Sequence, residues 1–164
     1  MLVHFGLTVA LYLGRQYDSA IEHAARALEI NANFPLVHFA LGMAQFQKGA
    51  LRESIASFER VLELAPSFSQ SVGFLAATYA RAGHRDHAEK LIREFSENPK
   101  AYVSPICLAL YHASLDEVDP MFEFLDASLA NREPSLPRTV AEPLFDPFRS
   151  DPRYRALLSA MNLG

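Results

Sequence analysis

A period of 34 residues is the feature of this sequence that most constrains its fold. Large apolar, small and glycine residues each recur at this spacing: Leu7, Leu41 and Leu75; Ala20, Ser54 and Ala88; Gly49 and Gly83. Such recurrence is typical of stacked structural units, because small residues let neighbouring helices approach closely and large residues fill the matching gaps. We therefore expect several copies of one unit, packed side by side.

The middle copy indicates what the unit is. Residues 34–47 carry apolar side chains at helical spacing, and Gly49 supplies the left-handed turn that ends such a helix. Residues 51–64 then have one apolar and one charged face, and Pro66 stops them. The unit is thus predicted to be two helices folded back on each other.

The order of residues in the middle copy carries a resemblance. Leu41-Gly42 is followed by Ser54, by Phe58 four positions later, and by Pro66. This pattern resembles the tetratricopeptide repeat (TPR), although the chain lacks the signature tryptophan. The resemblance implies an all-α fold, a right-handed TPR superhelix of antiparallel helix pairs with a C-terminal capping helix.

The period divides the chain into units. We expect one domain over residues 1–164, with units at about 1–33, 34–67, 68–100 and 101–133 and a C-terminal cap over 134–164. Ser104, Asp119 and Asp151 each precede a proline and are predicted to cap helices. Residues 132–150 contain four prolines, so we expect an irregular segment that plugs the face of the fourth unit.

The tail carries a narrower resemblance. Residues 102–105 read YVSP and residues 144–154 read LFDPFRSDPRY. These stretches are similar to the end of a family of bacterial TPR modules that follow cyclase, winged-helix or kinase domains in multidomain signalling proteins. No part of those catalytic or DNA-binding domains is present here. The resemblance therefore implies a signalling or regulatory setting without their activities.

Composition excludes some classes of function. The net charge of −4 argues against a nucleic-acid surface, and the lone Cys107 cannot form an internal disulfide. The apolar N-terminus lacks the positive start of an export signal and is too short to span a bilayer, so we expect a cytoplasmic protein with no membrane partner. No catalytic motif is present, and His84 with His87 lacks a third metal ligand. We expect no enzyme activity, metal or cofactor.

The resemblance assigns the first helix of each pair to a concave groove. The groove residues expected to contact a partner are apolar: Phe5, Val9, Tyr12, Phe39, Met43, Phe46 and Phe74. They predict a protein or peptide partner that presents an apolar or amphipathic helix. In the alternative, tight curvature buries these side chains between the units.

The first helix raises a second hypothesis. Its apolar face, with Leu2 and Phe5, has no polar helix before it in this sequence. Because solenoids need polar ends for solubility, we expect either that residues upstream of this sequence are missing or that something covers this face. Self-association as a homodimer is one way of covering it.

Overall fold

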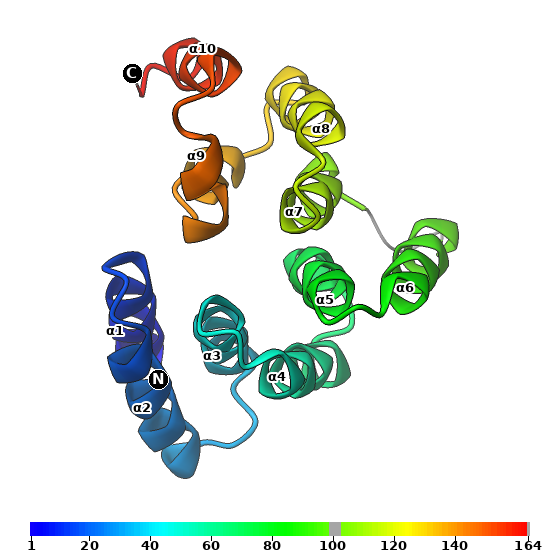
Figure 1. Ribbon diagram of the computed structural model, residues 1–164. Coiled ribbons are helices and arrows are strands. Elements are labelled where there is room, and N and C mark those ends of the chain that lie inside the picture. Colours follow the sequence, from blue (N-terminus) through cyan, green and yellow to red (C-terminus); the bar gives the residue numbers. More distant parts are fainter. Residues whose placement is uncertain (99–102, 164) are drawn as a thin grey trace.

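Eleven helices follow one another in this computed structural model, which describes residues 1–98 and 103–163 (Figure 1). Within these residues no strand occurs, and the predicted all-α repeat fold is confirmed. Pro99 and Tyr102, at the boundary between units three and four, lie outside the described residues. The helices are α1 (Leu2–Leu13), α2 (Tyr17–Ile30), α3 (Pro35–Gln47), α4 (Leu51–Leu64), α5 (Ser69–Arg81), α6 (Arg85–Glu97), α7 (Pro105–Ser114), α8 (Val118–Ala130), α9 (Leu136–Thr139), the 3₁₀ helix η1 (Pro143–Phe148) and α10 (Pro152–Ala160).

The long helices form an arc. Helices α3, α5 and α7 lie on its inner side, and α4, α6 and α8 lie on its outer side (Figure 1). From α1 to α6 each helix packs on the next, whereas α7 packs on α5 and α8; the inner helices α1 and α3 also pack on each other. After α8 the chain turns back, so that α9 and η1 lie on the inner side of the arc, facing α1 (Figure 1).

The turns inside the helix pairs share one backbone conformation. Gly49 and Gly83 have φ values of +75° and +83°, the left-handed conformation predicted for them. Arg15 and Asp116 take the corresponding place in units one and four, with φ values of +57° and +56°. Units one and four therefore reproduce the turn at the cost of placing a residue with a side chain where glycine is favoured.

Two of the three predicted helix caps are confirmed. The Ser104 hydroxyl accepts from the amide of Ile106 at 3.2 Å, and the Asp151 carboxylate accepts from the amide of Arg153 at 2.8 Å. The third prediction was wrong, because α8 begins at Val118 and Asp119 lies within its first turn.

The last helix covers the end of the fourth unit. Helix α10 packs on α8, and Arg153 binds Asp119 at 2.7 Å while its guanidinium lies 4.3 Å from the centre of the Phe122 ring. Tyr154 is fully buried and donates a hydrogen bond to the carbonyl of Val140. Residues 132–150 are not the irregular segment that was expected, because they form the short helices α9 and η1. The cap holds them against the inner side of the arc.

Candidate interaction surfaces

The seven residues expected to line an open groove fall into two groups. Phe5 and Val9 are partly buried on α1 and keep exposed surface. The other five are at most 3% exposed and belong to one continuous apolar cluster: Tyr12, Phe39, Met43, Phe46 and Phe74. As folded, these five present no surface to a partner, which favours the alternative in which the fold buries them.

The returning segment explains much of this burial. Phe145 of η1 is fully buried, in the same cluster as Tyr12 and Phe46. Beyond the cluster, Arg15 binds both carboxylate oxygens of Asp146, at 2.7 and 2.8 Å. Residues 136–148 therefore lie where a partner was expected.

A small cavity remains between this segment and the inner helices. It has a volume of about 160 Å³ and lies between η1 and the C-terminal ends of α3, α5 and α7. A space of this size holds a few water molecules and no helix.

Three buried polar atoms meet beneath the returning segment. Among the described residues no hydrogen-bond partner is found for Tyr12 Oη, Gln47 Nε2 or Glu142 Oε2. Burial raises the pKa of Glu142, while the nearby Tyr12 hydroxyl and then the charges of Arg138 and Arg15 oppose this shift. Burial, and then the charge of Glu142, also raises the pKa of Tyr12 well above its usual value.

Glu142 should therefore make the protein less stable as the pH rises. The pKa of Glu142 is higher in the folded than in the unfolded chain. Its stabilising contribution is therefore complete at pH values below the unfolded pKa of about 4.3, and it is lost as the pH rises through the folded pKa. Glu142→Gln should raise the free energy of unfolding at pH 7 by about 1–2 kcal/mol and leave it nearly unchanged at pH 4. Urea unfolding of both proteins at the two pH values measures this difference.

Asp146 provides the control for that prediction. Although partial burial opposes it, hydrogen bonds from Arg15 and Arg149 lower the pKa of Asp146. Asp146→Asn should therefore reduce stability at pH 7 and lose its effect towards low pH, the opposite dependence. An equal effect of Glu142→Gln at both pH values would show that the buried carboxyl does not titrate differently on folding.

Helix α1 carries an exposed apolar surface, which we call the N-terminal face. Leu2 is 69% exposed, Val3 81% and Leu7 46%. The small residues Gly6 and Ala10 are also exposed on α1, and nothing lies within 4 Å of a Cβ built on Gly6. The N-terminal face consists of Leu2, Val3, Gly6, Leu7 and Ala10.

Positions 34 and 68 residues further along the chain show how the equivalents of this face are packed in the other units. Val3 corresponds to Val37 and Ser71, and both are fully buried. Val37 lies in a cluster with alanines of α2, and the Ser71 hydroxyl donates to a backbone carbonyl of α4. The equivalents of the N-terminal face are thus covered by the second helix of the preceding unit.

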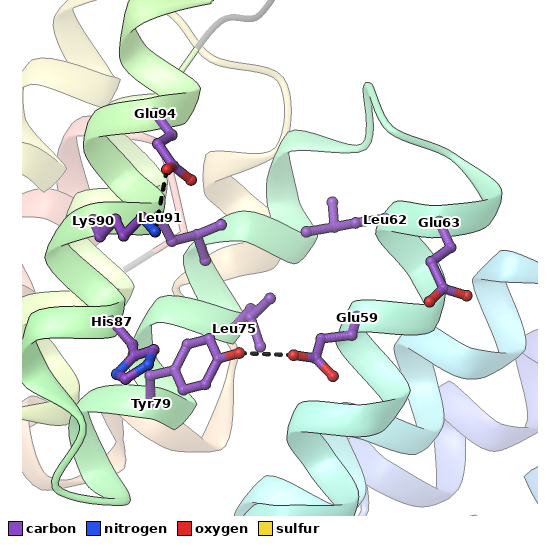
Figure 2. A pocket seen from close by; sticks show the side chains of 9 residues that line it. All are labelled: Glu59, Leu62, Glu63, Leu75, Tyr79, His87, Lys90, Leu91 and Glu94. Carbon is purple, nitrogen blue, oxygen red and sulfur yellow. Dashed lines mark hydrogen bonds and ion pairs between the residues drawn. The ribbon is translucent and has the colours of Figure 1, made fainter.

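A further opening lies between α4 and α6, above α5 (Figure 2). We call it the outer groove; its volume is about 640 Å³. Leu62 and Leu91 point toward each other from its two sides, and Leu75 lies between them (Figure 2). It is lined by Glu59, Leu62, Glu63, Leu75, Tyr79, His87, Lys90, Leu91 and Glu94. This surface was not among those expected from the sequence.

Three other features of the sequence have a place in the structure. His84 and His87 are exposed with ring centres 5.8 Å apart, and across residues 1–98 and 103–163 no group of three or more His, Cys, Asp or Glu side chains is arranged to hold a metal ion. Cys107 is buried, which raises the pKa of its thiol to about 12. Over the same residues, every helix falls short of the length and apolar character needed to cross a membrane.

Comparison with known proteins agrees with the geometry of the second unit. Residues 35–68, which contain α3 and α4, match the family model of the tetratricopeptide repeat. None of the curated proteins compared with the chain matches it. The match supports a tetratricopeptide repeat protein, and hence an interaction module in general.

Proposed function

We propose that the chain is a non-catalytic protein–protein interaction module that binds an apolar or amphipathic helix on its N-terminal face. The observation that carries the proposal is the exposure of Val3, 81%, at a position where Val37 and Ser71 are fully buried. An exposed apolar stripe on a soluble helix is destabilising unless another apolar surface covers it. Helices α2 and α4 cover the equivalent positions, so a helix is the occupant that this surface fits.

The proposed binding surface lies at one end of the arc, whereas the surface expected from the sequence lay on its inner side. Phe5 and Val9 stay among the proposed contacts, because they border the N-terminal face on α1 and are partly exposed. Tyr12, Phe39, Met43, Phe46 and Phe74 support the surface from within the core instead of touching the partner.

Helix α2 itself provides a probe for this surface. A synthetic peptide of residues 17–33 contains α2, whose alanine face covers α3 within the chain. We expect it to bind the native protein, and Leu7→Lys to weaken binding at least about tenfold by placing a charge in an apolar contact. Fluorescence anisotropy of the labelled peptide measures both affinities.

Leu163 provides the matched control. It is 52% exposed, close to the 46% of Leu7, and it lies at the other end of the chain. Leu163→Lys should leave peptide binding unchanged. If the peptide binds neither protein, or binds Leu7→Lys as well as the native chain, the N-terminal face does not take a helix of this kind.

A homodimer is the second candidate, favoured by the order of residues along α1. The large residues Leu2 and Val3 lie near its start, and the small residues Gly6 and Ala10 follow. Two antiparallel copies would place large residues against small ones around a two-fold axis. Light scattering over a concentration series should then give a dimer mass that Leu7→Lys reduces to a monomer and Leu163→Lys does not; a monomer mass throughout rejects this candidate.

We also propose a setting for the module. The resemblance of residues 144–154 to the end of bacterial signalling proteins supports a signalling or regulatory protein of the bacterial cytoplasm. In the structure these residues form η1 and the start of α10, which close the inner side of the arc.

A further inference from the structure

The outer groove differs from its two counterparts in the same chain. Between α2 and α4, the residues at the corresponding positions are Gln45 and Ser57, and the Ser57 hydroxyl donates to the Gln45 amide oxygen at 2.7 Å. Between α6 and α8, they are His112 and Phe124, whose rings stack with centres 5.4 Å apart. Each of these contacts joins the two helices of one unit, α3 with α4 and α7 with α8.

Tyr79 and Leu91 occupy these positions in the third unit, and both line the outer groove. The Tyr79 hydroxyl donates to Glu59 of α4 at 2.7 Å, and Leu91 points across the groove toward Leu62 (Figure 2). Leu75 is nearly fully buried beneath them. These leucines give the groove an apolar floor that is open to solvent above.

The rim of the outer groove is acidic. Glu59, Glu63 and Glu94 line it, against the single ammonium group of Lys90, which lies 3.7 Å from Glu94. Arg60 binds Glu63 at 2.7 Å and does not line the groove itself. A positive ligand would therefore find excess negative charge on the rim of an apolar floor.

From the floor and the rim together, we propose that the outer groove binds a basic amphipathic helix of a partner protein. Leucine-sized residues at helical spacing would contact Leu62, Leu75 and Leu91, and flanking lysine or arginine residues would face the three carboxylates. The interaction is independent of the N-terminal face, which lies on α1, so either proposal can fail without the other.

The test uses two designed helical peptides of about four turns with the same apolar stripe. One carries lysine and the other glutamate on its polar face. We expect the native protein to bind the lysine peptide with an affinity that falls as salt is raised, and to bind the glutamate peptide at least about tenfold more weakly. Isothermal titration calorimetry at low and at moderate salt measures this.

The counterpart between α2 and α4 supplies a conservative variant. Tyr79→Gln with Leu91→Ser copies the hydrogen-bonded pair Gln45–Ser57, so the double variant should fold with an unchanged helical signal but lose apolar lining from the groove. We expect it to bind the lysine peptide at least about tenfold more weakly than the native protein.

A charge control separates the groove from general attraction to an acidic protein. Glu53 is exposed on α4 and does not line the groove. Glu53→Gln should leave lysine-peptide affinity unchanged, whereas Glu94→Gln should lower it. The proposal is overturned if both peptides bind equally, if the double variant binds as the native protein does, or if Glu53→Gln and Glu94→Gln have equal effects.

Discussion

Replacing Phe145 by alanine should lower the free energy of unfolding by about 3–5 kcal/mol, the range for a fully buried aromatic side chain. Phe145 is 0% exposed and shares its cluster with residues of α1, α3, α5 and α7. A cavity at this point removes contacts from several units at once. Chemical unfolding followed by circular dichroism measures the loss, and one cooperative transition is expected because the cluster is continuous.

Phe95 gives this prediction a control of the same residue type. It lies on α6 and is only partly buried, outside the main cluster. Phe95→Ala should cost less than half as much as Phe145→Ala. If the two variants lose equal stability, or if Phe145→Ala costs less than about 1 kcal/mol, residues 136–148 are not an integral part of the core.

The helices themselves could be predicted from the sequence because their signals are local. The ends of α4 coincide with the predicted ones, since apolar spacing and turn residues both mark them. The caps of α7 and α10 likewise depend on side chains two positions from the amides they bind. The same kind of signal gave a wrong start for α8. Asp119 precedes a proline as the other two caps do, but the helix begins at Val118 and Glu117 is the residue before it.

The burial of the inner side could not be predicted in this way. It depends on contacts between residues far apart in the chain, such as Arg15 with Asp146, which are separated by 131 positions. The repeat period of the sequence does not indicate where a proline-rich segment outside the repeats will pack. The sequence therefore identified Tyr12 and Phe46 as inward-facing but not what would cover them.

The outer groove was missed although the sequence contains its signal. By the 34-residue period, Tyr79 corresponds to Gln45 and Leu91 corresponds to Ser57. A largely apolar pair in the third unit therefore replaces a polar pair in the second. The binding residues expected from the sequence all lie on the first helix of a pair, whereas Leu91 and Leu62 lie on second helices. The N-terminal face and the outer groove are both places where one unit departs from its equivalents.

Replacing Gly73 by valine should destabilise the protein by about 2–3 kcal/mol, although valine is the better helix former of the two. A Cβ atom at this position would lie 2.7 Å from the Cα atom of Cys107 on α7. The obstacle is backbone, so α5 and α7 must move apart. Thermal and urea unfolding measure the loss, with helical content at low temperature as the check on folding.

Gly6 is the matched control, because it is also a glycine inside a helix but has open space where its Cβ would be. Gly6→Val should change the free energy of unfolding by no more than about 0.5 kcal/mol. Shortening the neighbouring side chain by Cys107→Ala should not rescue Gly73→Val, since the Cα atom remains in place. Recovery of stability in that double variant would show that side-chain crowding, and not the backbone approach of α5 to α7, requires glycine at position 73.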